Sequence, residues 1–574
     1  MTETVGAGDA GAASYRRAVA LLDGLAAAGL ATVVVSPGSR STPLALAAAR
    51  CSALDLQVVA DERSAAFFAL GVARASGRPA AVVATSGSAP SHWLPAAIEA
   101  AEDEQPLLLL SADRPPELLD CGANQATGQA RLFDEHARAL HRLPPDASEA
   151  HARDVGRRAA MQCLWPRPGP VHLNIAFREP LVAARPEQCA AWTPGVPRAH
   201  PPARVTPDLG AVAAAAARLD GRRGAILAGR LAPGDPAASA LVELAVALDC
   251  PVIADPLSGL RAGADSQARI LVTADTFLRH PEAPVPDWLI RVGRPPVSRA
   301  VEEWAARCPE TLLLAASPAW TDPLRSAAKV LLGDPAASLS VLGAAVARAG
   351  LRASRWDALD RLEAASLAAL DGLDAPPAEL ALVRAVAAAT PPDTPVFVAN
   401  SLVARDFDSF LPRREAPLAL HANRGVSGID GNVSTAAGLV AATGRPGVAV
   451  IGDLALFHDL NALALCRQHP LVLVVVNNGG GAIFGQLPQA SLPEFDSLWL
   501  TPPALDLARA AALFDLPHAR LETAAGLAEA IGTALQTGRS ALLELVVDRA
   551  ASHAGRRAWW EAVRGGGSPE SSVF

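Results

Sequence analysis

The stretch GDLALFHDLNALALCRQHPLVLVVVNNGGGAIF, at residues 452–484, is the segment that most clearly indicates the fold. A short apolar run at residues 448–451 ends in Gly452-Asp453, and a second run at residues 471–476 ends in two asparagines and three glycines. Uninterrupted apolar runs are typical of strands that are covered on both faces, as in parallel sheets flanked by helices. The segment therefore predicts two parallel strands joined by a helix-like connection.

The residues that follow these two strands have the chemistry of a metal and phosphate site. Because the carboxyl ends of parallel strands meet at one edge of a sheet, we expect Asp453 and Asn478 to lie on the same edge. A carboxylate, an amide oxygen and the backbone carbonyl of Gly480 suit an octahedral Mg²⁺, or Mn²⁺, that takes its other ligands from a diphosphate. The spacing has the form of the thiamine-diphosphate signature, although Leu454 stands where that signature usually has glycine. The alternative is a glycine-rich turn after a buried strand.

Short apolar runs alternate with longer helical stretches over almost all 574 residues. This alternation predicts the α/β class with parallel sheets. Proline-rich stretches at residues 186–207 and 376–395 interrupt it and are typical of linkers. We therefore predict three domains, at residues 1–190, 191–370 and 371–574, each of ordinary size.

The first and third predicted domains contain similar segments. ALGVARASGRPAAVVATSG at residues 69–87 aligns with AAGLVAATGRPGVAVIGDL at residues 436–454, with Gly71 opposite Gly438 at an offset of 367. Both segments have the pattern of a helix, a turn, a strand and a loop, and loops at such strand ends are where open α/β sheets bind ligands. We predict two repeats of one fold, with coincidence in an alanine-rich chain as the alternative.

Charge and composition exclude several classes of function. Lys+Arg 50 against Asp+Glu 58 gives a net charge of −8, which argues against nucleic acid or an anionic membrane as a partner. The apolar runs are far shorter than the roughly 20 residues of a membrane-spanning helix. No signal peptide is evident, and the seven cysteines are scattered rather than paired. We therefore expect a cytoplasmic protein with reduced cysteines.

Further segments resemble one enzyme family. They are SPGSRSTPLALAA (36–48), DERSAAFF (61–68), TSGSA (85–89), ADRP (112–115), NQ (124–125), NSLVARDFD (400–408), NRGVSGIDG (423–431) and GDLALFHDLNALAL (452–465). Together they resemble the MenD family, the thiamine-diphosphate-dependent synthases of menaquinone biosynthesis, in which Leu454 is usual. The resemblance implies three Rossmann-like domains: a pyrimidine-binding domain, a central transhydrogenase-like domain and a diphosphate-binding domain.

The resemblance also implies a reaction. Members of this family are transferases that decarboxylate 2-oxoglutarate on thiamine diphosphate and add the remaining four-carbon unit to isochorismate, releasing CO₂. Two other interpretations stay open. One is another thiamine-diphosphate 2-oxoacid lyase, such as an acetolactate synthase, whose small apolar acceptors need fewer arginines. The other is a nucleotide-binding regulatory protein without catalysis, against which intact Glu62, Asp453 and Asn478 argue.

By the resemblance, Glu62 is the catalytic carboxylate that pairs with the aminopyrimidine of the cofactor, and Ile429 wedges beneath the cofactor to keep it bent. The offset of 367 pairs these two residues. For Glu62 alone, an exposed residue after a buried strand at residues 58–60 is the alternative. The implied cofactor-binding residues are Glu62, Asn400, Ser401, Gly428, Ile429, Asp453, Leu454, Ala455, Asn478, Gly480, Gly481 and Ile483, and the implied metal ligands are Asp453, Asn478 and Gly480.

Both substrates are dicarboxylates, so guanidinium groups should converge on them as bidentate clamps. The implied substrate-binding residues are Ser39, Arg40, Arg114, Gln125, Arg299, Ser401, Arg405, Arg424, Ile483, Phe484 and Leu487. Among these, Arg299 would reach in from the middle domain, and the three apolar residues would limit access of water. His92 stands where the family more often has asparagine, and we interpret it as a local hydrogen-bonding substitute.

Enzymes of this superfamily share each site between subunits. The resemblance therefore implies a homodimer as the minimum active unit and a homotetramer as a dimer of dimers.

Overall fold

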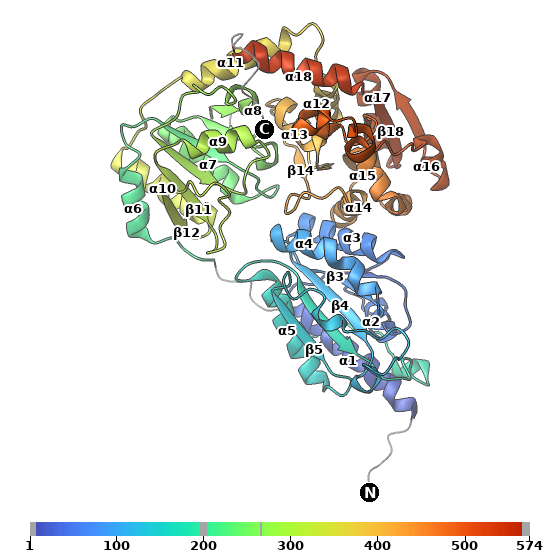
Figure 1. Cartoon of the computed structure of the whole chain (residues 1–574). Helices are drawn as coiled ribbons and strands as arrows, with labels where there is room; N and C mark the ends of the chain where they lie inside the picture. The colour runs from blue at the N-terminus through green and yellow to red at the C-terminus, as the bar shows by residue number, and fades with distance from the viewer. Residues whose placement is uncertain (1–6, 196–203, 264–266, 565–574) are drawn as a thin grey trace. The chain divides into compact units, whose positions relative to one another are not determined.

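The computed structural model describes residues 7–195, 204–263 and 267–564. These residues form three six-stranded sheets flanked by helices, which confirms the α/β class with three parallel sheets (Figure 1). Within the same ranges, no helix is both long and apolar enough to cross a membrane.

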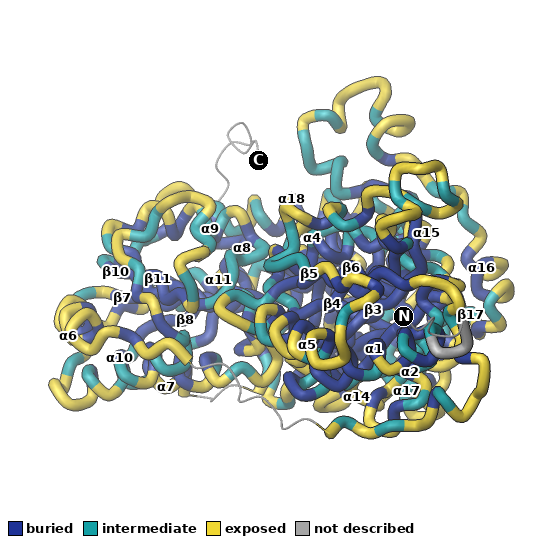
Figure 2. Tube along the Cα trace, turned by 90° about the horizontal axis from the view of Figure 1, so that it is seen from below, coloured by how far each residue is buried: buried dark blue, intermediate teal, exposed yellow. Residues whose placement is uncertain are grey.

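The first sheet has the strand order β2-β1-β3-β4-β6-β5, and its paired strands are parallel. Its strands are β1 (Thr32–Val35), β2 (Asp55–Val58), β3 (Ala80–Ala84), β4 (Leu107–Asp113), β5 (Ala139–Leu143) and β6 (Val171–Ala176). Its helices are α1 (Ala7–Ala27), α2 (Thr42–Ala49), α3 (Glu62–Ser76), α4 (Leu94–Glu102) and α5 (Glu149–Leu164). The central strands β3 and β4 are buried along their whole length, as Figure 2 shows in dark blue.

The third sheet has the order β14-β13-β15-β16-β18-β17. Its strands are β13 (Pro395–Val398), β14 (Ala419–His421), β15 (Gly447–Gly452), β16 (Leu471–Asn477), β17 (His518–Leu521) and β18 (Ala541–Val546). Its helices are α12 (Ala378–Ala389), α13 (Leu402–Phe410), α14 (Asn432–Thr443), α15 (Asp453–His458), α16 (Leu507–Leu513), α17 (Ala524–Thr537) and α18 (Arg549–Arg564). This order repeats that of the first sheet strand for strand, so the predicted repeat is confirmed.

The second sheet has the order β12-β11-β10-β7-β8-β9. Its strands are β7 (Gly224–Ala228), β8 (Val252–Ala254), β9 (Ile270–Leu271), β10 (Trp288–Val292), β11 (Thr311–Ala315) and β12 (Lys329–Leu332). Its helices are α6 (Leu209–Ala217), α7 (Pro236–Leu248), α8 (Ala274–Phe277), α9 (Arg299–Ala306), α10 (Pro335–Ala349) and α11 (Ala358–Asp371). Taken from β9, the order is that of a doubly wound nucleotide-binding fold, as the alternation in this region predicts.

The described residues divide into two compact units. One unit comprises those within 1–203, 423–445 and 458–471, and the other comprises those within 204–422, 446–457 and 472–574. Helix α14 of the second repeat therefore belongs to the unit built on the first sheet. There, Ala437 of α14 shares an apolar core with Phe67 and Phe68 of α3.

Helices α3 and α14 approach so closely at Gly71 and Gly438 that neither position has room for a side chain. A Cβ atom on Gly71 would lie 2.1 Å from the carbonyl oxygen of Thr435, and one on Gly438 would lie 2.1 Å from the carbonyl oxygen of Phe68. Because 438 − 71 and 435 − 68 both equal 367, the two halves of the contact are related by the offset of the repeat. The helix pair is thus locally twofold, since each helix presents the equivalent surface to the other.

A buried aspartate fixes the first turn of α14. Asp459 is 0% exposed, and its carboxylate accepts hydrogen bonds from the backbone N–H (2.8 Å) and the Oγ (3.1 Å) of Ser434. Burial raises the pKa of Asp459 to about 6, although these hydrogen bonds favour the charged form. Asp459 stands at the start of the 3₁₀ helix Leu460–Arg467, so it joins that helix to α14.

The predicted buried strand before Glu62 is wrong. The strand before Glu62 is β2, which ends at Val58 and lies at the edge of its sheet, so Val58 is 60% exposed rather than buried. The predicted helix-like connection after Asp453 is confirmed: it is α15 followed by a 3₁₀ helix, and the break between them falls at Asp459, whose carboxylate accepts hydrogen bonds from α14. Part of the first predicted linker, residues 196–203, lies outside the described residues.

The helix contact predicts the effect of one methyl group. Gly71→Ala should lower the midpoint of thermal unfolding, because overpacking a tight contact costs about 1–3 kcal/mol. Gly343→Ala is the matched control, since Gly343 also lies inside a helix, α10, but its Cβ would meet nothing within 4 Å. The control should be unchanged or more stable, by up to about 1 kcal/mol. Equal midpoints for Gly71→Ala and wild type, measured by circular dichroism, are inconsistent with this contact.

Asp459 predicts a pH dependence of stability. Its pKa in the folded chain, about 6, lies above the roughly 3.9 of an unfolded aspartate, so between these values only the folded state keeps the proton. The contribution of Asp459 to stability is therefore present below about pH 4 and is lost as pH rises to 6. The uncharged, isosteric Asp459→Asn variant should become more stable relative to wild type over this window, by at most about 3 kcal/mol.

The measurement is the unfolding midpoint of both proteins from pH 4 to pH 7. Asp506→Asn, at an exposed helix N-cap in α16, controls for the loss of one charge. A difference between Asp459→Asn and wild type that does not vary with pH argues against the raised pKa.

Candidate active site

Asp453 and Asn478 follow β15 and β16, which are neighbours in the third sheet. Asp453 is 3% exposed, and its carboxylate accepts hydrogen bonds from the backbone N–H groups of Leu454 (2.9 Å) and Gly480 (2.8 Å). Burial raises the pKa of Asp453, and these hydrogen bonds oppose the rise. The Oδ1 atom of Asn478 is buried and has no hydrogen-bond partner among the described residues. A buried, unpaired acceptor at the strand end next to a buried carboxylate fits a bound cation.

No group of three or more His, Cys, Asp or Glu side chains in the described ranges could hold a metal ion. The edge of the third sheet is compatible with that finding, because it offers one carboxylate, one amide oxygen and a backbone carbonyl. Such a donor set suits a hard cation that shares its coordination sphere with a phosphate ligand.

The glycine loop after β16 approaches its neighbours by backbone alone. Gly479 and Gly480 have φ angles of +76° and +114°, a region that side chains rarely allow. A Cβ atom on Gly480 would lie 2.1 Å from the carbonyl oxygen of Leu500, to which the N–H of Gly481 donates at 2.6 Å. The loop is therefore held in place, and its glycines bring no side chain of their own into the space beside Asp453.

The loop after β13 contains strained backbone. Asn400 is 2% exposed, and Ser401 has a φ of +68°, which costs a non-glycine residue about 1–3 kcal/mol and is commonest at functional sites. One turn into α13, the Nη1 of Arg405 donates to the carbonyl oxygen of Ser401 at 2.9 Å. Because β13 is the other neighbour of β15, these residues lie at the same sheet edge as Asp453.

Two arginines converge at the carboxyl edge of the first sheet. Arg40 is 5% exposed and donates to the carbonyl oxygen of Phe177 and the carboxylate of Glu179, both at 3.0 Å. Arg114 bonds to the Oγ of Ser86 and reaches the Oε1 of Gln125 at 3.5 Å. Burial and the positive charge of Arg40 both lower the pKa of Arg114. The carboxylates of Glu179 and Asp113 oppose this fall, so the two guanidinium groups already lie beside negative charge.

A network of buried polar residues that no sequence motif indicates lies beneath this site. Gln129 is 0% exposed and donates from Nε2 to the Oδ1 of Asn174 and the carbonyl oxygen of Ala112, both at 2.9 Å. Its Oε1 accepts the N–H of Gly87 at 3.0 Å, and Asn174 donates to Asp113 at 2.7 Å. The network thus fixes the strand ends that carry Ser86 and Arg114. Gln129 and Asn174 lie outside the motifs of the sequence, so no local pattern indicates them.

Glu62 is the first residue of α3 and is half-buried. The carboxylate of the N-cap residue Asp61 accepts the N–H of Ser64 at 3.1 Å, which completes the helix start. Arg424, Gly428 and Ile429 lie half-buried in the loop before α14.

Both repeats match models of known protein families. Residues 16–136 match the model described as thiamine pyrophosphate enzyme, N-terminal TPP binding domain, and residues 404–545 match the corresponding C-terminal TPP binding domain. The 2-succinyl-5-enolpyruvyl-6-hydroxy-3-cyclohexene-1-carboxylate (SEPHCHC) synthase of Dechloromonas aromatica (strain RCB) is 41% identical over 544 residues, which are 94% of this chain and 99% of that protein. The chain belongs to the SEPHCHC synthase family.

Other relatives carry the same name. The SEPHCHC synthase of Geobacillus kaustophilus (strain HTA426) is 39% identical over 565 residues, which are 95% of this chain and 97% of that protein. Among solved structures, the benzoylformate decarboxylase of Polynucleobacter necessarius matches with a TM-score of 0.69 at 18% identity, covering 94% of this chain and 99% of that chain. At that identity, the structure supports the fold alone. The relatives do not support the acetolactate-synthase interpretation.

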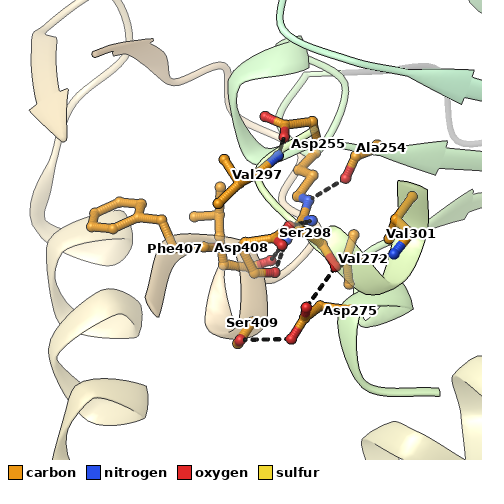
Figure 3. A network of polar contacts seen from close by, with 12 residues as sticks. Ala254, Asp255, Val272, Asp275, Val297, Ser298, Val301, Phe407, Asp408 and Ser409 are labelled. Carbon is orange, nitrogen blue, oxygen red and sulfur yellow. Dashed lines mark hydrogen bonds and ion pairs between the residues drawn. The ribbon is translucent and has the colours of Figure 1, made fainter. Parts of the chain in front are cut away.

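Within this member of the SEPHCHC synthase family, buried polar contacts tie the second sheet to α13 (Figure 3). Arg261 is 2% exposed and donates to the Oδ1 (2.8 Å) and the backbone carbonyl (2.6 Å) of Asp408 in α13. Asp275 accepts hydrogen bonds from the Oγ atoms of Ser298 (2.6 Å) and Ser409 (3.5 Å). Because Ser298 caps α9, the network fixes the start of α9 relative to α13.

The remaining residues implied by the SEPHCHC synthase resemblance are less buried. Arg299, the first residue of α9, has a side chain that is 70% exposed and pairs with Glu303 at 2.7 Å. Ser39 and His92 are exposed. The apolar residues after the glycine loop are half-buried in or beside the 3₁₀ helix Ala482–Gln486, and they are Ile483, Phe484 and Leu487. Leu454 and Ala455 lie in the first turn of α15.

The metal-binding edge predicts a specific loss of ligand-induced stabilisation. Thiamine diphosphate with Mg²⁺ should raise the unfolding midpoint of the wild-type chain, since a ligand at 100 times its Kd adds about 2.7 kcal/mol. Asp453→Asn should lose most of this shift, because an amide lacks the charge that holds the cation. Asp496→Asn, an exposed residue of the same repeat, should keep it. The same shift in Asp453→Asn as in wild type, measured by differential scanning fluorimetry, would place the metal elsewhere.

Proposed function

We propose that the chain is a SEPHCHC synthase, which decarboxylates 2-oxoglutarate with the aid of thiamine diphosphate and joins the remaining four-carbon unit to isochorismate, releasing CO₂. The observation that carries the proposal is the arginine pair Arg40 and Arg114 at the ligand edge of the first sheet, in a chain whose relatives are synthases of this name. A site for two dicarboxylates needs such a concentration of positive charge.

The residues at the edge of the third sheet fit the cofactor. Asp453, the unpaired Oδ1 of Asn478 and the carbonyl of Gly480 would hold Mg²⁺ or Mn²⁺, with the diphosphate as a further ligand. When bound, thiamine diphosphate supplies an electron sink for breaking the bond between the keto carbon and the carboxylate of a 2-oxoacid. Asn400 and Ser401 would contribute further polar groups to this pocket.

Glu62 is proposed as the catalytic carboxylate. Its carboxyl group would exchange a proton with the aminopyrimidine nitrogen of the cofactor and thereby fix the tautomer that the reaction needs. Ile429 would support the bent cofactor from below, and Gly428 beside it would leave room for the ring. The half-buried place of Glu62 as the first residue of α3 supports this role, because the carboxyl group stays accessible to a ligand.

The substrates would be held by charge and shielded by apolar side chains. Arg40 and Arg114 would form bidentate contacts to carboxylates, with Gln125 as a hydrogen-bonding partner. Arg405, Arg424 and Arg299 are proposed to bind the second substrate's carboxylates or to close the site over them, and Ser39 and Ser401 would add hydrogen bonds. Ile483, Phe484 and Leu487 would exclude water that would otherwise protonate the intermediate.

The assembly and the domain borders remain predictions. We propose a homodimer as the minimum active unit, with each site shared between two copies, and a homotetramer as its dimer. The domains at residues 1–190, 191–370 and 371–574 are proposed to bind the pyrimidine, to connect, and to bind the diphosphate. The cytoplasmic location stays a prediction from the sequence.

The test is turnover with alternative substrates. Purified protein with thiamine diphosphate and Mg²⁺ should consume 2-oxoglutarate and isochorismate together, followed by the loss of isochorismate absorbance. Pyruvate alone should give less than about one hundredth of that rate, because it lacks the second carboxylate that the arginines are proposed to bind. High activity on pyruvate would overturn the assignment in favour of an acetolactate-synthase type of lyase.

Glu62→Gln and Glu149→Gln complete the experiment. Both residues are the first residue of a helix, α3 and α5, so the two variants make the same change in the same local setting. Glu62→Gln should bind cofactor but lose turnover by a factor of about 10³ or more, in line with removal of an acid–base group. Glu149→Gln should retain the wild-type rate.

A further inference from the structure

The loop at residues 423–431 carries Arg424 and Ile429. It is hydrogen-bonded to a buried carboxylate from a distant part of the sequence. Glu99 of α4 is 2% exposed, and its Oε1 and Oε2 accept the backbone N–H groups of Gly425 (2.7 Å) and Val426 (2.8 Å). One carboxylate thus holds two successive peptide groups, which fixes both the position and the orientation of the loop.

The backbone of this loop is strained directly after the two hydrogen-bonded peptide groups. Ser427, directly after Val426, has a φ of +62°, a left-handed conformation that serine adopts only when its surroundings enforce it. Gly425 has no room for a side chain, since its Cβ would lie 2.6 Å from the carbonyl oxygen of Glu99. The two hydrogen bonds therefore stabilise a loop conformation that the sequence would not adopt by itself.

Glu99 lies near a positively charged side chain, but its surroundings are unfavourable to a charged carboxylate. Arg74 lies 3.7 Å from Glu99 and pairs with Asp103, while its Nη2 donates to the Oδ1 of Asn423 at 3.2 Å. Burial and the negative charge of Asp103 raise the pKa of Glu99. A carboxylate near the C-terminal end of α4 is also disfavoured by the helix dipole. Alanine has a higher helix propensity than glutamate, so the stability of α4 does not account for a glutamate here.

We propose that Glu99 is a positioning residue, which holds the loop at residues 423–431 so that Ile429 meets the cofactor and Arg424 meets a substrate carboxylate. This inference rests on the proposed function for the roles of Ile429 and Arg424. Glu99 touches neither ligand and acts through the peptide groups of Gly425 and Val426. The loop's free side, where Val426 is 50% exposed, remains available to ligands.

Two changes from opposite sides of the contact test the proposal. Glu99→Gln replaces one acceptor by an N–H group that faces the N–H groups of the loop. Gly425→Ala keeps the carboxylate but forces the loop away from α4. Both variants should raise the Kd for thiamine diphosphate with Mg²⁺, measured by isothermal titration calorimetry, at least ten-fold. Both should also raise the KM for a substrate more than they lower kcat.

Asp103→Asn is the matched control, because it removes one negative charge from the same buried cluster without touching the two captured N–H groups. Its Kd should stay within two-fold of wild type even if its unfolding midpoint falls. Lower midpoints in Glu99→Gln and Gly425→Ala with unchanged Kd and KM would show a purely structural role and overturn the proposal. If Glu99→Gln does not fold, Gly425→Ala decides alone.

The Kd values from calorimetry test the role of Glu99 independently of the proposed reaction. A wild-type chain that binds the cofactor but does not turn over 2-oxoglutarate with isochorismate would refute the function. The Kd values of the variants would still support or overturn the role of Glu99 at the cofactor.

Discussion

The close contact between α3 and α14, at two positions where a side chain would clash, fixes how these helices pack within one compact unit. Gly71 of α3 and Gly438 of α14 each face the other helix's backbone carbonyl, and the symmetry of the contact follows from the common origin of the helices. Such an approach leaves few alternative arrangements, because any side chain at either position would separate the helices. The start of α3 and the loop before α14, which we propose to contribute Glu62 and Ile429 to the site, are positioned by this helix pair.

Buried carboxylates then refine the positions that the helices set. Asp459 holds the first turn of α14, and Glu99 holds the loop before it. In the other unit, Asp275 and Asp408 hold α9 and α13 through Ser298 and Arg261. In each case a carboxyl group removed from water bonds to groups of another element, so that element cannot shift without leaving a buried polar group unpaired. A net charge of −8 on the whole chain gives no hint of these local arrangements, nor of the arginine pair at the first sheet.

The amino-acid sequence predicts those features that local patterns encode. The apolar runs predict the parallel strands, the offset of 367 predicts both the repeated strand order and the equivalence of Gly71 with Gly438, and the strand ends predict the common edge of Asp453 and Asn478. The sequence gives no sign that the two equivalent glycines would touch each other. It also gives no sign of Glu99, because an isolated glutamate on a helix is usually exposed and its partners lie 326 residues away. The sequence predicts the strand before Glu62 at the wrong residues, because an edge strand with exposed residues lacks an uninterrupted apolar run.

The central claim is that ligand edges of the two repeats serve one thiamine-diphosphate site for dicarboxylates. A crystal structure with thiamine diphosphate, Mg²⁺ and 2-oxoglutarate tests it most directly. The account predicts the metal on Asp453, Asn478 and the carbonyl of Gly480, the carboxylate of Glu62 at the aminopyrimidine, and Arg40 or Arg114 on a carboxylate of 2-oxoglutarate. A cofactor bound without Glu62, or a 2-oxoglutarate that contacts neither arginine, would contradict it.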